Sequence, residues 1–365
     1  MPERARLPSI PRPLLRRVEN TTPFAHFVGD KMGPSRRFFD VVVVRGTFVL
    51  APGRLTRAEE QAPVVLADEV WDSEDAARSS LKQAGDLHLA KPGADVCVTG
   101  TARAPDGQAR PRWDVAVAVH GAWQALASHT LVACGPRAWH YVRGDWLLAE
   151  PRPTAEVPIR YELAYGGAFR DPHQEWRIHK PNPSGRGFAD ASTADRRAPL
   201  PAPQWELPSR PVRRLGEVVP VAGLGPLARF WSARAQYAGT YDDLWRAKAS
   251  ASHAAGAPID YPPDFDARFL HTAPPELRAS RPLRGDERIG LVGLVAGHPR
   301  FTTQLPGVEV VASLFVRGGT WVEQPMSLDT VHIDLDAARV ALVWRLVLDR
   351  ARGVTGAVIG WRNMS

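Results

Sequence analysis

Short runs of apolar residues, many of them alternating with polar ones, recur along most of the chain. Residues 38–50 (FFDVVVVRGTFVL) are β-branched and aromatic, and the apolar side chains of their first half would face both sides of a sheet. Residues 113–119 alternate large side chains with small or polar ones, which is typical of a strand with one face on a core. Residues 330–335 and 339–347 have the pattern of a hairpin. Further strand-like runs are 95–102, 130–134, 289–295 and 308–316.

Two stretches have a helical pattern instead. Residues 72–83 (DSEDAARSSLKQ) carry acids at their start and a lysine near their end, as a short helix would. Residues 226–248 place apolar side chains at helical spacing after Pro226, with Gly239 able to end one helix and Thr240 able to cap a second. We expect the aromatic side chains of this stretch to pack mostly against the sheets.

Together these patterns predict a mainly β (α+β) fold. We expect a large antiparallel β-sandwich or barrel-like scaffold with a short helical insertion around 226–248 and long irregular loops. The 34 prolines and 30 glycines suit many short strands joined by turns. The longest irregular stretch is expected at 170–222, where proline, glycine and arginine dominate.

The ends of the chain are expected to differ from its middle. Residues 1–17 are rich in proline and arginine and predict a flexible tail. Residues 18–350 predict a single β-rich domain, with the alternative of two closely packed halves, 18–150 and 157–350. Residues 351–365 are expected to be a peripheral C-terminal segment.

The formal net charge is +7, but the basic residues do not have the distribution of a nucleic-acid surface. Only five of the 46 basic residues are lysine, and the arginines are scattered rather than gathered in a stripe with interleaved aromatics. We therefore expect no nucleic-acid partner.

The sequence also lacks the patterns of a membrane span, a signal peptide or a metal site. No stretch approaches the ~20 apolar residues of a membrane-spanning helix, and the N-terminus has no apolar run of the kind found in signal peptides. Cys97 and Cys134 lie in apolar, strand-like runs and are expected to be buried free thiols of a reducing compartment. The 11 histidines are dispersed without a metal-ligand spacing. We expect a cytoplasmic protein with no cofactor, no metal and no membrane partner.

Motifs of common enzyme classes are absent from the sequence: there is no Gly-x-Ser-x-Gly, no GxxxxGK[ST] and no HExxH. The block 231–276 nevertheless keeps an enzymatic hypothesis open, because a glycosidase needs two carboxylates in a cleft and this block combines acids with aromatic residues. Its acids are Asp242, Asp243, Asp264, Asp266 and Glu276. The prolines just before Asp264 and Asp266 are more typical of turns than of catalytic sites. A carbohydrate-active hydrolase is therefore the alternative to a non-enzymatic function.

Several segments, in a fixed order from about residue 18 to 350, resemble one protein family. They include NTTPF at 20–24, VVRGTF at 43–48, GDLHLAKPGADV at 85–96, PIRYELAYGG at 158–167, NPSGRG at 182–187, GTYDDLW at 239–245, DFDARF at 264–269 and APP at 273–275. The family that they resemble is the large domain-of-unknown-function family encoded beside type VI secretion effectors, whose members are regarded as effector adaptors or chaperones.

The resemblance implies a non-enzymatic, cytoplasmic bacterial protein. Such a protein would hold a cognate secreted effector, through an N-terminal segment or a PAAR-type spike-tip domain, and promote its loading onto the VgrG spike. The resemblance implies no catalytic residue. A structural component of the secretion apparatus, which would bind spike proteins without an effector, is a further alternative.

The loop at 258–276 is the best candidate for an exposed contact with a partner. Its prolines and acids favour turns, and exposed aromatic and arginine side chains are the usual anchors of a protein interface. The predicted partner-binding residues are Tyr261, Asp264, Phe265, Asp266, Arg268 and Glu276.

Overall fold

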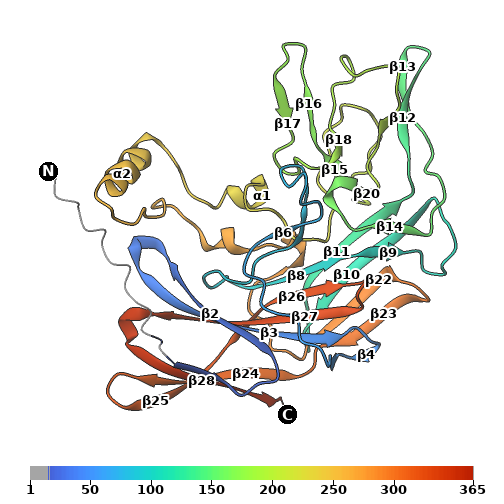
Figure 1. The fold of residues 1–365 in the computed structure, drawn as a ribbon. Helices are drawn as coiled ribbons and strands as arrows, with labels where there is room; N and C mark the ends of the chain where they lie inside the picture. The colour runs from blue at the N-terminus through green and yellow to red at the C-terminus, as the bar shows by residue number, and fades with distance from the viewer. Residues whose placement is uncertain (1–14, 16, 365) are drawn as a thin grey trace.

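The computed structural model describes Leu15 and residues 17–364, and most of its regular structure is β-strand (Figure 1). The strands form several open sheets rather than one closed barrel, and most neighbouring strands are antiparallel. The described residues contain two α-helices, α1 (Ser232–Ala235) and α2 (Asp243–Ala254). The prediction of a mainly β fold with a short helical insertion is confirmed. Neither helix is long and apolar enough to cross a membrane.

The largest sheet joins the N-terminal and C-terminal parts of the chain. Its strands, in spatial order, are β2 (Ala25–Met32), β3 (Phe38–Val49), β27 (Arg339–Asp349), β26 (Ser327–Asp334), β8 (Ala94–Thr99) and β21 (Arg278–Ala279), with β5 (Thr56–Arg57) also on β3. The antiparallel ladder between β3 and β27 runs from the pair Phe39/Asp349 to the pair Val49/Arg339. The hairpin predicted at 330–347 is therefore present, and it lies in the middle of this sheet.

Two further sheets complete the scaffold. The six-stranded sheet has the order β20 (Trp205–Glu206), β11 (Ala125–Cys134), β10 (Arg112–His120), β22 (Arg288–Val295), β23 (His298–Gln304) and β4 (Gly53–Arg54). The four-stranded sheet has the order β1 (Arg17–Asn20), β28 (Val354–Asn363), β24 (Val308–Val316) and β25 (Thr320–Pro325). The remaining short strands are β12 (Ala138–Val142) with β13 (Asp145–Leu148) and β19 (Leu200–Pro201), β14 (Glu156–Pro158) with β9 (Thr101–Arg103), β15 (Tyr165–Gly166) with β18 (Arg186–Gly187), β16 (Ala168–Arg170) with β17 (Trp176–Ile178), and β6 (Glu69–Val70) with β7 (Leu81–Gln83).

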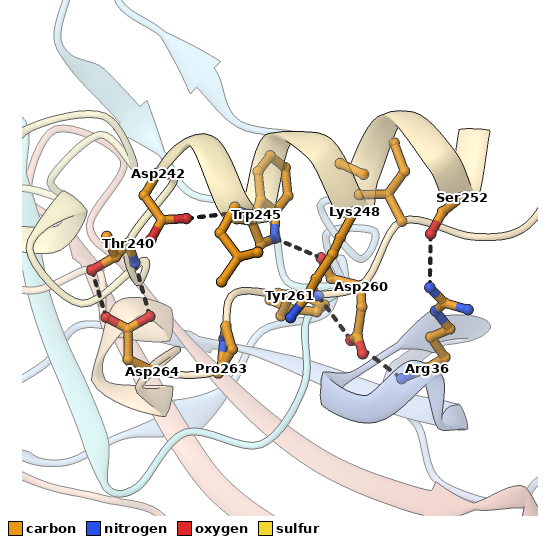
Figure 2. A pocket seen from close by; sticks show the side chains of 13 residues that line it. Arg36, Thr240, Asp242, Trp245, Lys248, Ser252, Asp260, Tyr261, Pro263 and Asp264 are labelled. Atoms are coloured by element: carbon orange, nitrogen blue, oxygen red, sulfur yellow. Dashed lines mark hydrogen bonds between the residues drawn. The ribbon is translucent and has the colours of Figure 1, made fainter. Parts of the chain in front are cut away.

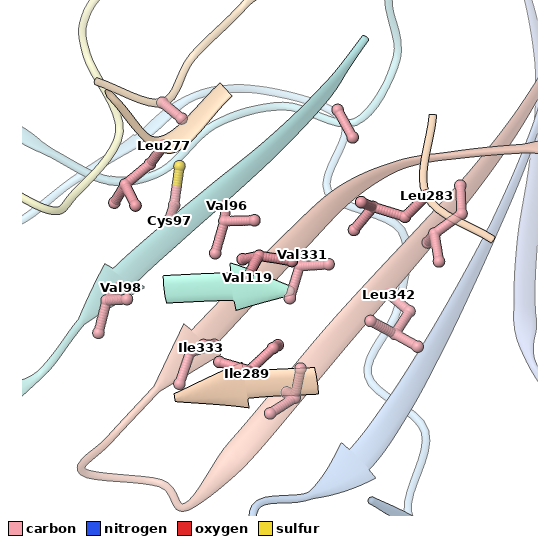
Figure 3. Close-up of a cluster of buried hydrophobic side chains, with 14 of the residues drawn as sticks. Val96, Cys97, Val98, Val119, Leu277, Leu283, Ile289, Val331, Ile333 and Leu342 are labelled. Atoms are coloured by element: carbon pink, nitrogen blue, oxygen red, sulfur yellow. The ribbon is translucent and has the colours of Figure 1, made fainter. Parts of the chain in front are cut away.

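The main hydrophobic core lies between the seven-stranded and six-stranded sheets (Figure 3). Val331 and Leu342 of the first sheet belong to the same buried cluster as Val119 and Ile289 of the second. Side chains alternate between the two faces of a strand, so the period-two pattern of β10 places every second residue in this core. The arrangement is that of two sheets packed face to face.

Strand β3 is buried on both of its faces, as its continuous apolar run predicts. Val42 and Val44 point into the main core. Val41 and Val43 belong to a second cluster together with Val343, on the other side of the sheet.

The C-terminal segment is not peripheral, so that prediction is wrong. Residues 354–363 form β28, which is paired with β1 on one side and with β24 on the other. Val354, Ala357 and Ile359 are buried in the main core. Strand β28 is therefore an integral part of the scaffold, because it pairs with a strand on each side and buries three side chains.

The helix predicted at 72–83 is also absent. The carboxylate of Asp72 accepts hydrogen bonds from the main-chain N–H groups of Glu74 and Asp75, which closes a turn instead. Such local side-chain bonds compete with helical hydrogen bonds. The end of the stretch is strand β7, which is paired with β6.

The insertion predicted at 226–248 is helical over different residues. Pro226 does not start a helix: α1 begins only at Ser232, and the N–H of Leu227 bonds the carbonyl of Thr272 in the neighbouring segment. The second helix extends to Ala254, and its N-cap is Asp242, whose Oδ1 accepts the N–H of Trp245 at 2.7 Å. Trp231 is fully buried as expected, whereas other aromatic and apolar side chains here are exposed: Phe230, Tyr241 and Leu244.

Three further predictions concern the N-terminal tail, the irregular stretch 170–222 and the division of the domain into two halves. The tail at 1–17 lies outside the described residues except for Leu15 and Arg17. The stretch 170–222 contains short strands and contributes Val212, Leu215 and Val219 to a separate buried cluster. The main core takes side chains from both 18–150 and 157–350, and their division into two halves stays a prediction.

Candidate functional site

Helix α2 and the loop that follows it stand off from the sheets (Figure 1). Most side chains of α2 are exposed, and Ser252 is the one buried residue of this helix. Leu244 leaves 64 % of its surface exposed although it is aliphatic. Because a surface helix normally buries its apolar face, exposed apolar residues on a projecting helix point to a contact with another molecule.

A cleft of about 490 Å³ lies between α2, the loop at 259–264 and the turn that connects β2 with β3 (Figure 2). Its apolar lining comes mainly from Leu244, Trp245, Ile259 and Tyr261. Its charged lining residues are Arg36, Asp242, Lys248, Asp260 and Asp264. The cleft thus combines apolar and charged lining residues, and protein interfaces commonly contain both kinds.

Asp260 joins the three parts of this cleft. Its Oδ1 accepts the N–H of Tyr261 at 2.8 Å and the N–H of Arg36 at 3.3 Å (Figure 2). Its carbonyl accepts the indole N–H of Trp245 at 3.2 Å, and Arg36 Nη2 donates to Ser252 Oγ at 2.7 Å. These bonds connect α2 to the loop and to the distant β2–β3 turn.

The β2–β3 turn has an unusual backbone where it meets α2. Ser35 and Arg36 have φ values of 59° and 56°, in the left-handed region that non-glycine residues rarely occupy. A left-handed conformation costs about 1–2 kcal/mol per residue. The bonds of Arg36 to Asp260 and Ser252 hold this conformation, and strained backbone of this kind is common in binding sites.

Asp264 and Asp266, two of the predicted partner-binding residues, make local contacts. Both carboxylate oxygens of Asp264 accept hydrogen bonds from Thr240, at 2.9 Å from its N–H and 2.7 Å from its hydroxyl, and these bonds lower the pKa of Asp264. Asp266 caps the 3₁₀ turn Ala267–Leu270 by accepting the N–H of Arg268 and also bonds the guanidinium of that arginine, which lowers the pKa of Asp266. Both acids are therefore turn-forming groups in this conformation.

The remaining predicted residues of the loop form a small aromatic array. The rings of Tyr261 and Phe265 meet edge to face with centroids 4.6 Å apart, and Phe265 continues to Phe269 at 5.9 Å. The Arg268 guanidinium lies over the Tyr237 ring at 4.4 Å. These contacts fix the loop, and they leave Tyr261 on the lining of the cleft.

Glu276 is separate from the other predicted residues. It lies in the 3₁₀ turn Pro275–Leu277 and is exposed on a second cleft that shares no lining residue with the first. The structure therefore brings Tyr261 and Asp264 together on the α2 cleft. Phe265, Asp266 and Arg268 do not line it, and Glu276 lines the second cleft.

Asp95, which sequence reasoning missed, anchors the whole segment to the scaffold. It is fully buried on β8, and its carboxylate accepts bonds from His271 Nδ1 at 2.7 Å, from the Thr272 N–H at 2.7 Å and from the Thr272 hydroxyl at 3.1 Å. Lys91 Nζ forms an ion pair with it at 2.8 Å. Burial alone would raise the pKa of Asp95, but the charge of Lys91 and the hydrogen bond from His271 together hold it well below its ordinary value. The sequence feature that could have identified Asp95 is the presence of an aspartate in an otherwise apolar, strand-like run.

Arg345 extends this buried network. It forms an ion pair with Asp329 at 2.6 Å and donates to the carbonyl of Asp86, whose carboxylate pairs with Arg45 at 2.8 Å. Buried ion pairs of this kind fix one arrangement of the elements that carry them. The described residues include no group of three or more histidine, cysteine or acidic side chains placed to hold a metal ion.

Comparison with known proteins gives one match. The family of uncharacterized proteins conserved in bacteria, DUF2169, matches residues 36–345. No curated protein and no solved structure matches the chain significantly. Since the family match covers most of the chain and includes both clefts and the Asp95 anchor, the protein belongs to the DUF2169 family.

Proposed function

We propose that this protein is a non-enzymatic adaptor or chaperone of type VI secretion, acting in the bacterial cytoplasm. It would bind a cognate effector through the N-terminal or PAAR-type region of that effector and promote its loading onto the VgrG spike. The proposal combines the ordered sequence segments that resemble effector adaptors with the surface formed by α2 and the loop at 259–264.

The observation that carries the proposal is the projecting helix with its apolar cleft. Leu244 and Tyr241 are exposed on or beside a cleft lined by Trp245 and Ile259. Clustered aromatic and aliphatic side chains in a concave surface are the usual source of binding energy between proteins.

The scaffold keeps this surface in one arrangement before a partner arrives. Asp260 ties α2 to the β2–β3 turn, and Asp95 ties residues 271–272 to the central sheet. A surface that is already ordered loses less conformational entropy on binding.

The hydrolase alternative has less support from the same geometry. A glycosidase needs one carboxylic acid with a raised pKa as the proton donor. Asp264 and Asp266 have lowered pKa values instead, because each accepts several hydrogen bonds. A structural role in the secretion apparatus differs from the proposal only in its partner, which would be a spike protein alone.

The proposal is tested by co-expression with the effector encoded next to this chain. We expect a complex that co-elutes in size-exclusion chromatography and a higher soluble yield of the effector. Leu244→Glu, which places a charge on the apolar border of the cleft, should weaken the complex. Leu147→Glu is the matched control, because Leu147 is also more than half exposed but lies on β13, away from α2.

Three outcomes separate the hypotheses. Failure to bind any adjacent effector would overturn the adaptor proposal. Stable binding to VgrG or PAAR proteins without an effector would favour the structural role. Cleavage of a glycan panel that is lost in the Asp264→Asn/Asp266→Asn double variant would establish the hydrolase instead.

A further inference from the structure

The second cleft, on which Glu276 lies, has a volume of about 480 Å³ and a mostly aliphatic lining. Four prolines from three separate parts of the chain contribute to it. They are Pro181, Pro220, Pro274 and Pro275. Val218 also lines it and leaves 61 % of its surface exposed.

The prolines restrict how a partner can bind here. Proline has no main-chain N–H, so a peptide that adds as a β-strand would find few donors along this lining. An apolar side chain that inserts between the prolines and Val218 fits this cleft better than an added β-strand does. Its binding depends on shape and apolar area and needs no main-chain hydrogen bonds.

The cleft is formed before any partner binds. Arg234 ties the lining residue Leu227 to the segment that leads to Pro274: its Nη1 donates to the Leu227 carbonyl at 2.8 Å, and its Nε donates to the Phe269 carbonyl at 3.1 Å. The hydroxyl of Tyr161, which lines the cleft, donates to the Gly225 carbonyl at 3.0 Å. These buried bonds hold the lining without help from a ligand.

Two charged side chains on this cleft have no ionic partner in the described chain. Arg210 and Glu276 are both exposed lining residues, and neither forms an ion pair with another described residue. An interface that complements this cleft would present one acidic group to Arg210 and one basic group to Glu276.

We infer that the second cleft binds an extended segment of the partner protein with an aliphatic side chain between the prolines, an acidic side chain at Arg210 and a basic side chain at Glu276. The inference rests on the proposed function, since it specifies the part of the partner that the adaptor holds. It adds a contact that is physically separate from the α2 cleft.

The first test measures the affinity of purified variants for the adjacent effector by isothermal titration calorimetry. Arg210→Glu and Glu276→Arg should each raise Kd about tenfold or more, and Val218→Asp should do the same. The matched controls are Arg213→Glu and Val322→Asp, exposed residues of the same types that do not line the cleft, and they should leave Kd within about twofold. If the effector binds the cleft variants as tightly as the wild type, the inference is wrong while the proposed function stands.

The second test uses random peptides displayed on phage and does not depend on the effector. Peptides are selected on the wild-type protein and counter-selected on the Arg210→Glu/Glu276→Arg double variant. Enrichment of an aliphatic residue flanked by one acidic and one basic residue supports the inference even if the adjacent effector does not bind. Selection of no common pattern, or of peptides that bind the double variant equally well, overturns it.

Discussion

The Asp95 anchor gives the sharpest prediction about stability. Asp95→Asn keeps the shape of the side chain but removes the negative charge that faces Lys91 Nζ at 2.8 Å. The Lys91 side chain is only 1 % exposed, and its next carboxylate, Asp329, is 4.0 Å away. Removing one partner of a buried ion pair typically costs about 3–5 kcal/mol, because the other charge stays buried without compensation.

This loss can be converted into a melting temperature. An unfolding entropy of about 2.1 cal/mol/K per residue gives about 0.8 kcal/mol/K for 365 residues that unfold as one unit. The variant should therefore melt about 4–6 °C lower than the wild type in differential scanning calorimetry. A larger shift confined to one of two transitions would indicate that the halves 18–150 and 157–350 unfold separately.

The pH dependence provides an independent check with a defined sign. The pKa of Asp95 is lower in the folded than in the unfolded protein, so its stabilisation is complete above the unfolded value, near pH 4, and is lost as the pH falls through the folded value. The difference between wild type and Asp95→Asn should stay constant from pH 7 to about pH 5 and shrink below about pH 4.

A double variant decides whether the ion pair is the cause. Lys91→Met/Asp95→Asn removes both charges and should be more stable than Asp95→Asn alone. Asp243→Asn, on the exposed start of α2, is the control and should melt close to the wild type. The reasoning is refuted if Asp95→Asn loses less than about 1 kcal/mol, or if the two substitutions are simply additive.

Three further predictions concern the helix, the thiols and the C-terminal strand. Asp242→Ala removes the N-cap of α2 and should destabilise this helix by about 1 kcal/mol. The measurement is amide hydrogen exchange, which should be roughly fivefold faster in α2 alone. Unchanged exchange would show that Asp242 does not stabilise the helix. Burial raises the pKa of both Cys97 and Cys134 to about 12. Neither thiol should therefore react with a thiol reagent at pH 8 until urea unfolds the protein. Rapid labelling of either thiol in the folded protein would contradict the burial. A chain that lacks residues 354–363 should fail to fold cooperatively, because β1 loses the strand it pairs with and β24 loses one of its two neighbours. A wild-type melting temperature for this chain would show that β28 is dispensable.

The sheets were predictable where burial follows directly from a local pattern. Strand β3 reads as apolar on both faces and has a hydrophobic cluster on each side, and β10 alternates in the sequence and in its burial. The C-terminal hairpin was expected at 330–335 and 339–347 and forms from strands Ser327–Asp334 and Arg339–Asp349. In β10 the period of two decides which face is buried, whereas in β3 the continuous apolar run predicts burial on both faces.

The errors came from interactions that a local pattern does not contain. Strand β28 carries two outward glycines, Gly356 and Gly360, which dilute its alternation, and its partners lie far away in the sequence. At 72–83 the side chain of Asp72 bonds the next N–H groups and replaces the expected helical bonds. At 226–248 the N–H of Leu227 bonds Thr272, a residue distant in the sequence, and the helix begins only at Ser232.

The candidate site was predictable only in outline. The loop at 258–276 was identified from its aromatic residues and prolines, and Tyr261 does line a cleft. Arg36 could not be assigned to the same cleft, because it is about 220 residues from its partners Ser252 and Asp260 and only the folded chain brings them together. Glu276 is the last residue of the same loop, but it lines the second cleft, beyond residues 271–272, which are anchored to Asp95.

Hydrogen–deuterium exchange on a complex with the proposed effector partner tests the central claim most directly, because it shows which part of this surface a partner covers. We predict slower exchange on binding in α2 and in residues 259–276, and no change in the buried strands β3 and β27, which are already protected. A stable complex in which α2 and residues 259–276 exchange as fast as in the free protein would contradict the account.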